Sequence, residues 1–221
     1  MKRAGSRMID VLRAGFAPDA VPYLDGWELQ RTVHAGVVDG SRPETLILLE
    51  HEPVFTAGSR TEPHERPTAS GTPVINVDRG GRITWHGPGQ LVGYPIMHAE
   101  DRGRAVGVVR RIERMLIELI APYGIDGIAV EGRSGVWVQR TDGAQDKIAA
   151  IGMRVAHGVT MHGFALNCNH SLAPYEEIVA CGIADAGVTT IARESRRDVS
   201  PADLADAAAS AFRNAFERIP A

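Results

Sequence analysis

The sequence predicts a single-domain α+β protein, and three observations lead to this prediction. Several strand-like segments follow one another through short turns, which favours antiparallel pairing. Three segments have the apolar spacing of amphipathic helices. The regular strand-helix alternation of a doubly wound parallel sheet is absent. The chain has 221 residues, of which 44% are hydrophobic, so it can bury a substantial core. We expect residues 1–221 to form one domain, with residues 1–7 as a flexible N-terminus.

In the first half, residues 8–12 are predicted to form a short strand, and residues 20–37 a helix with its apolar rhythm in Val21, Leu24, Trp27 and Leu29. The apolar run in residues 44–51 predicts a central strand buried on both faces. The polar residues 52–71 are expected to form a long loop. Strands at 74–77 and 90–97 flank the glycine-rich string RGGRITWHGPG.

In the second half, residues 105–122 predict a helix that buries Val108, Ile112, Met115, Leu116 and Leu119. Its opposite face carries Arg110, Arg114 and Glu118, for which solvation is the expected state. Strands are predicted at 135–139, 147–155 and 160–168. A last helix begins after Ser200, a suitable N-cap that precedes Pro201.

Composition narrows the function classes. The net charge is −3, which does not favour binding to nucleic acid. No segment approaches the ~20 apolar residues of a membrane span, and the first ten residues do not resemble a signal peptide. We therefore expect a cytoplasmic protein, with a monomer as the default state.

The two cysteines have different surroundings. Cys168 alternates with Phe164 and Leu166 on one face of a strand, which is typical of an inert core thiol. Cys181 precedes a glycine, which leaves room for a substrate carbonyl, although many free cysteines are simply buried. A nucleophilic thiol also needs a base or a nearby cation. Lys147 and the eight histidines are candidates, but spacing alone does not pair any of them with Cys181.

Other motifs are weaker. His86 stands beside glycine and proline residues that allow a ligand to approach closely, or it is a turn histidine with local hydrogen bonds. The pairs His51-Glu52 and His64-Glu65 lack the spacing of a zinc site. The glycine clusters match no nucleotide-binding pattern. We therefore expect no metal, no ATP and no other cofactor.

Six ordered blocks of sequence resemble the lipoyl (octanoyl) transferase family. They are EHEPVFTAG (50–58), RGGRITWHGPGQLVGYP (79–95), RSGVWV (133–138), KIAAIG (147–152), HGFALN (162–167) and CGI (181–183). Glu52 and Ser59 depart from the usual family pattern, within the predicted loop. The resemblance implies an α+β sandwich, with a mixed and largely antiparallel sheet flanked by helices, similar to the catalytic domain of biotin and lipoate protein ligases.

The resemblance also implies an activity. Members of this family transfer an octanoyl group from acyl carrier protein to a lysine of lipoyl domains, in 2-oxoacid dehydrogenase subunits and the glycine cleavage H protein. Carried over by position, Cys181 becomes the acyl-thioester nucleophile and Lys147 the residue that activates it. The residues implied to line the acyl substrate are Arg79, Gly80, Gly81, Arg82, Ile83, Thr84, Trp85, His86, Ala150, Ile151, Gly152, Gly163, Phe164 and Ala165.

Two other functions are compatible with the sequence. An ATP-dependent lipoate or biotin ligase could use the same fold. A non-catalytic protein that binds lipoyl domains or acyl carriers would need neither Lys147 nor Cys181.

Overall fold

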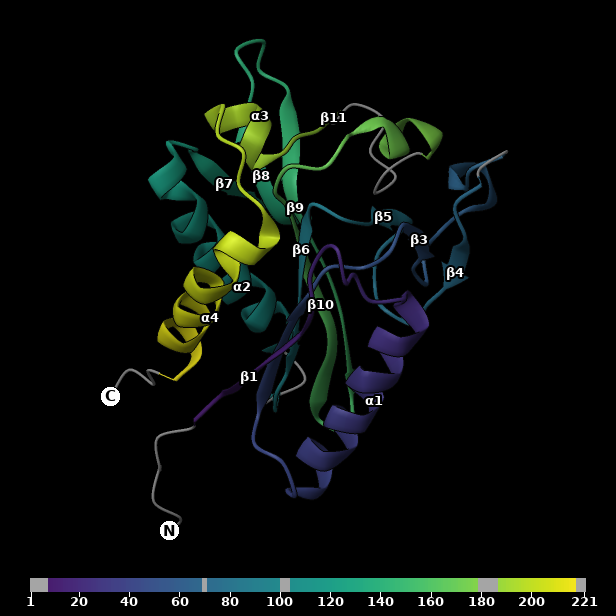
Figure 1. The fold of residues 1–221 in the computed structure, drawn as a ribbon, viewed down its shortest axis with the longest axis vertical. Coiled ribbons are helices and arrows are strands. Elements are labelled where there is room, and N and C mark those ends of the chain that lie inside the picture. Colours follow the sequence, from purple (N-terminus) through teal and green to yellow (C-terminus); the bar gives the residue numbers. More distant parts are fainter. Residues whose placement is uncertain (1–7, 69–70, 100–103, 179–186, 218–221) are drawn as a thin grey trace.

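The computed structural model describes residues 8–68, 71–99, 104–178 and 187–217. Its main element is an eight-stranded sheet in the order β1-β2-β6-β10-β9-β8-β7, with β11 also paired to β9 (Figure 1). The β1-β2 and β11-β9 pairs are parallel and the others are antiparallel. The strands are β1 (Asp10–Gly15), β2 (Thr45–Leu49), β6 (Gln90–Ile96), β7 (Gly127–Val130), β8 (Arg133–Gln139), β9 (Gln145–Ala156), β10 (Val159–Asn167) and β11 (Gly187–Val188).

Helices cover both faces of this sheet (Figure 1). Helices α2 (Arg104–Ile120) and α4 (Pro201–Phe216) pack together on one face, and α1 (Tyr23–Asp39) lies on the other. A hydrophobic core lies on each face of the sheet, and β2 contributes to both because its side chains alternate. Leu46 and Leu48 face α2 and α4, whereas Ile47 and Leu49 face α1. The predicted α+β class, with a largely antiparallel sheet between helices, is confirmed.

A second sheet of three strands stands beside α1. It consists of β3 (Val54–Ala57), β4 (Val74–Asn76) and β5 (Thr84–His86), in the order β4-β3-β5. The prediction of a continuous loop over residues 52–71 was therefore wrong, because β3 lies within that stretch. The four residues of β3 are all buried between two neighbours, and so short a segment carries little periodicity of its own.

The helix predictions were correct in position and partly correct in facing. In α2, Ile112, Met115, Leu116 and Leu119 are buried as expected. In α1, however, Leu24 is 59% exposed. The buried face of α1 instead runs through Tyr23, Gly26, Gln30, Val33, His34, Gly36 and Val37. Gly26 helps this face to pack closely against the sheet, because a Cβ there would lie 2.7 Å from the buried His51 ring.

The remaining elements are short. They are α3 (Ile191–Ser195) and the 3-10 helices η1 (Pro63–Glu65), η2 (Ala121–Tyr123) and η3 (Ala173–Glu177). The predicted N-cap of α4 is confirmed. The Ser200 side chain accepts a hydrogen bond from the Asp203 backbone N–H, and the Asp203 side chain accepts one from the Ser200 backbone N–H.

Candidate active site

A cavity of about 530 Å³ lies where strand pairing stops. The β8-β9 ladder ends at Val136 opposite Ala149, whereas β9 continues beside β10 as far as Ala156. Beyond that point the edge of β9 meets the glycine loop, where the Gly80 N–H donates to the Met153 carbonyl at 3.2 Å. The cavity is bounded by this loop, by β9 and β10, and by the first turns of α2.

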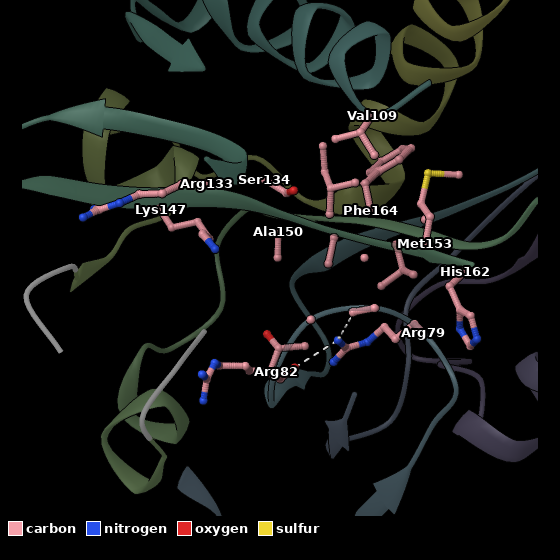
Figure 2. Close-up of a pocket in the computed structure, with 18 of the residues that line it drawn as sticks. Arg79, Arg82, Val109, Arg133, Ser134, Lys147, Ala150, Met153, His162 and Phe164 are labelled. Atoms are coloured by element: carbon pink, nitrogen blue, oxygen red, sulfur yellow. Dashed lines mark hydrogen bonds between the residues drawn. The ribbon is translucent and has the colours of Figure 1, made fainter. Parts of the chain in front are cut away.

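Most of the residues implied by the family resemblance line this cavity. They are Arg79, Gly80, Gly81, Arg82, Thr84, His86, Lys147, Ala150, Ile151, Gly152, Gly163, Phe164 and Ala165. Ile83 and Trp85 do not line it; they pack with Phe55 and Ile178 in a separate cluster. Segments that lie far apart in the sequence thus converge on one cavity (Figure 2).

Two glycines on adjacent strands allow close packing in this region. Gly152 and Gly163 lie opposite each other in the β9-β10 ladder. A Cβ on Gly152 would lie 2.9 Å from the Gly80 carbonyl oxygen and 3.1 Å from Arg79 Cδ. A Cβ on Gly163 would lie 2.1 Å from the Gly93 carbonyl oxygen. Larger residues at either position would force the backbone apart.

Arg79 fixes the glycine loop to the small sheet. Its guanidinium donates to the carbonyls of Gly80, Arg82 and Thr56 at 2.8–3.0 Å, and to the Thr56 hydroxyl at 2.9 Å. The side chain is only 8% exposed, and Figure 2 shows it beneath the β9-β10 surface. The loop is therefore held by a buried cation that bonds mainly to backbone carbonyls.

One end of the cavity carries neutral polar rings. His86 contacts the Thr56 hydroxyl at 3.1 Å and Gln90 Oε1 at 2.7 Å, and burial lowers the pKa of His86 to about 3. Burial likewise raises the pKa of Tyr23 to about 12 and raises that of Tyr94. His86 was placed in a turn by the sequence but belongs to β5.

His162 reaches this same end because its backbone has φ +58, which turns its side chain toward Asp78, with Nε2 and Oδ1 at 2.7 Å. Burial, followed by the charge of Arg79, lowers the pKa of His162 to about 3. His51 is not among the lining residues, but it is hydrogen-bonded at 2.6 Å to Tyr94, which lines the cavity. These rings are thus uncharged near neutral pH.

Two arginines that line the cavity are anchored by buried carboxylates. Arg82 pairs with Glu65 at 2.6 Å, and Arg110 pairs with Glu113 at 2.7 Å. Glu65 and Glu113 are 1% and 0% exposed. The predicted solvation of this helix face is confirmed for Arg114 and Glu118, which are exposed, whereas Arg110 lines the cavity with its side chain 39% exposed. Sequence periodicity puts Arg110 off the core face but gives no sign of the gap between β8 and β9.

The charged side chains among the described lining residues are all cations, although the buried carboxylates Glu65 and Glu113 balance two of them. The cavity lining includes Arg60, Arg79, Arg82, Arg110, Arg133 and Lys147, and no carboxylate occurs among the described lining residues. Such a setting favours anions that form during acyl transfer, namely a thiolate or a tetrahedral oxyanion.

Lys147 is 8% exposed at the end of the cavity next to β8. Its ammonium lies 4.5 Å from the centre of the Trp137 ring. Strand β11 pairs with β9 at this position, with Val188 opposite Lys147.

The cysteines can be assessed only in part. Cys181 lies outside the described residues. Cys168 is fully buried, and burial raises the pKa of its thiol to about 12. The predicted core position of Cys168 is confirmed, and its inertness stays a prediction.

Within the described residues, no group of three or more histidine, cysteine, aspartate and glutamate side chains is arranged to hold a metal ion. None of the helices in this part of the chain is long and apolar enough to cross a membrane.

Comparison with known proteins decides the family. Residues 22–213 match the model of the lipoyl protein ligase A/B catalytic domain. The chain belongs to this family. An octanoyltransferase of Pseudarthrobacter chlorophenolicus is 52% identical over 206 residues, which cover 93% of this chain and 92% of that protein. An octanoyltransferase of Clavibacter sepedonicus is 56% identical over 201 residues, covering 89% and 86%.

A solved lipoate protein ligase of the same fold comes from Thermoplasma acidophilum. It has a TM-score of 0.67 at 12% identity and covers 94% of this chain and 83% of its own. The expected ligase-like fold is therefore confirmed, and the much higher identity to the octanoyltransferases confirms the resemblance seen in the sequence blocks.

Proposed function

We propose that this member of the lipoyl protein ligase A/B family transfers an octanoyl group from acyl carrier protein to a lysine of a lipoyl domain, with a thioester on Cys181 as intermediate. Its relatives at 52% and 56% identity, covering most of both chains, are octanoyltransferases. The enzyme is accordingly an acyltransferase. The acceptors would be the lipoyl domains of 2-oxoacid dehydrogenase subunits and the glycine cleavage H protein. We further propose a cytoplasmic monomer.

The observation that carries the proposal is the position of Lys147 in the cavity wall. Lys147 is a buried lysine whose strand partner Val188 follows Cys181 by seven residues. Ile178, three residues before Cys181, is anchored beside Trp85. A buried lysine in the cavity wall is the kind of group that can favour the thiolate form of a cysteine, which supports the proposed pairing of Lys147 with Cys181.

In the proposed first half-reaction, Lys147 takes the proton of the Cys181 thiol. The thiolate attacks the carrier thioester, a new carbon-sulfur bond forms, and the bond to the carrier sulfur breaks. The carrier thiolate then takes the proton from the Lys147 ammonium, which leaves Lys147 as a neutral amine for the second half-reaction. One thioester replaces another, so no ATP is required, and we propose that the enzyme uses no cofactor or metal.

In the second half-reaction, the acceptor lysine attacks the acyl-enzyme as a neutral amine. A carbon-nitrogen bond forms, the bond to Cys181 breaks, and Lys147 accepts the proton that the amine loses. The cations around the cavity would stabilise the oxyanion of both tetrahedral stages. Burial of the octanoyl tail against Ile151, Phe164 and the glycine edges would contribute on the order of 5 kcal/mol, at about 0.8 kcal/mol per methylene.

The decisive experiment mixes the purified enzyme with octanoyl-acyl carrier protein in the absence of ATP, and records intact mass. We expect an octanoyl adduct in the wild type and in Cys168→Ser. The adduct should be absent in Cys181→Ser and slower to form in Lys147→Ala. Full turnover by Cys181→Ser would contradict the thioester route.

The same assay tests the rivals. A ligase would use free octanoate only when ATP is added. A non-catalytic binding protein would retain the carrier or the lipoyl domain but would form no adduct and no product.

A further inference from the structure

The side chain of Lys147 lies across the ring of Trp137. The two residues face each other in the β8-β9 ladder, and the Lys147 ammonium is 4.5 Å from the ring centre. This separation is well within the range of a cation-π contact. Trp137 is 1% exposed and Lys147 is 8% exposed, so water screens the contact only weakly.

A bulge in β9 produces this arrangement. Val136 pairs with Ala149 but Trp137 pairs with Lys147, so β9 has one extra residue between the two pairs. Ile148 and Ala149 both join the core beneath α2 and α4. Because of the bulge, Lys147 lines the cavity together with Ala150 rather than following strict alternation.

Gly135 lies beside the lysine side chain and against the backbone of β9. It has φ +122, and a Cβ on it would lie 3.5 Å from Lys147 Cε and 2.4 Å from the Ala149 carbonyl oxygen. The first distance is an ordinary van der Waals contact, whereas the second is a clash with the strand. The backbone of β9 and the positive φ therefore require glycine at this position.

A second cation shares the same ring. The Arg133 guanidinium carbon is 5.7 Å from the ring centre, and the indole N–H of Trp137 donates to the Arg133 carbonyl at 3.4 Å. Figure 2 shows Arg133 and Lys147 at the same end of the cavity. The indole thus holds two positive side chains at the place where the acyl transfer is proposed to occur.

We propose that Trp137 is a positioning residue that holds the Lys147 ammonium in the cavity wall through the face of its indole ring. A ring face attracts a cation without neutralising its charge. This role rests on the proposed function, because Lys147 acts only if the thioester route operates.

A large buried tryptophan can also be a purely structural residue, so the test must vary the ring charge at constant shape. Tryptophan carrying one, two or three fluorine atoms weakens the attraction of the ring for a cation while it changes packing little. We expect the rate of octanoyl adduct formation to fall progressively with each fluorine, reaching roughly a tenfold loss with three. Because all three tryptophans are labelled, Trp137→Phe provides the control: its rate should not respond to fluorine in Trp27 and Trp85.

Two unlabelled variants give a second reading. Trp137→Phe keeps a ring face, whereas Trp137→Leu keeps only an apolar side chain. We expect adduct formation several-fold faster in the phenylalanine variant when the two have equal urea midpoints. In NMR spectra, the Lys147 Cε protons should be shifted upfield by the ring in the wild type but not in Trp137→Leu.

The outcomes separate the two proposals. Adduct formation that is indifferent to fluorine, with equal rates in the two variants, would overturn the role of Trp137 and leave the proposed function intact. The absence of any adduct in unlabelled wild type would overturn the proposed function, and the role of Trp137 with it.

Discussion

The side chain of Glu113 is hydrogen-bonded to the backbone of Gly135, with Oε1 and the N–H 3.0 Å apart. Glu113 belongs to α2. Gly135 directly precedes Val136, the first residue of β8 that pairs with β9. A helix carboxylate therefore satisfies a backbone donor at the point where the ladder ends. Its second oxygen accepts from Arg110 at 2.7 Å, so one buried group supports both the end of the ladder and the cationic wall of the cavity.

Removal of the Glu113 carboxylate should destabilise the fold. Glu113→Leu leaves the Gly135 N–H buried without its acceptor, and we expect a loss of about 2–3 kcal/mol in the free energy of unfolding, measured with urea. Glu113→Gln keeps an amide oxygen for Gly135 and should lose about 1 kcal/mol. Glu118→Gln, on the exposed face of the same helix, should change stability by less than about 0.5 kcal/mol. Equal stability of the leucine variant and the wild type would refute this assignment.

Gly152→Ala should impair acyl transfer. The added Cβ would press on the Gly80 carbonyl at 2.9 Å and on Arg79, and would displace the glycine loop that lines the cavity. We expect the rate of adduct formation to fall by about tenfold, as small displacements of groups that position a substrate are costly. Gly107→Ala is the matched control, because a Cβ there meets nothing within 4 Å. In a helix interior that change should instead stabilise the protein by about 0.5–1 kcal/mol, without slowing transfer.

The buried histidines predict acid sensitivity. Burial lowers the pKa of His51 to about 4, and the pKa values of His86 and His162 to about 3. Below pH 6.5 the unfolded chain therefore binds protons that the folded chain does not. Stability should be fully present above pH 6.5 and fall below it by about 1.4 kcal/mol per pH unit for each histidine, down to about pH 4 for His51 and about pH 3 for His86 and His162.

Urea unfolding measured between pH 7.5 and pH 4.5 checks this expectation. His86→Gln should reduce the slope by the contribution of one proton. A slope that is unchanged in this variant would mean that His86 is protonated in the folded state.

Cys168 should be unreactive in the native enzyme. Its thiol is fully buried, and burial raises its pKa to about 12, so very little thiolate forms near neutral pH. In the Cys181→Ser variant, which retains only Cys168, a thiol reagent at pH 8 should label the unfolded chain within minutes and the native chain only through unfolding. Rapid labelling of the native variant would show that Cys168 is accessible.

Local sequence patterns were sufficient for the elements with strong periodicity. The apolar run at β2 and the stripe along α2 predicted both elements, because burial on two faces or on one face imposes those patterns. The strands β3, β5 and β7, of three or four residues each, depend on neighbours supplied by distant segments. Local pattern could not reveal them.

The candidate site divides in a similar way. The ordered sequence blocks indicated most of the residues that line the cavity. They did not indicate Glu113 or Tyr23, because the roles of these residues come from contacts across the fold, such as the bond between Glu113 and Gly135 over 22 positions. The sequence also could not show that the Lys147 side chain points into the cavity. Such a prediction would rest on the alternation of side chains along β9, and the bulge at Ile148 breaks that alternation.

The end of the β8-β9 ladder at Ala149 suggests how such a cavity can vary among proteins of this architecture. Its length follows from the number of consecutive residues at which two neighbouring strands have separated. Each additional rung lost or gained would lengthen or shorten the space by about 3.3 Å, the rise of one strand residue. A change of preferred acyl length would then occur in discrete increments, and could arise by insertion or deletion near residue 135 without any change in the chemical groups that perform the transfer.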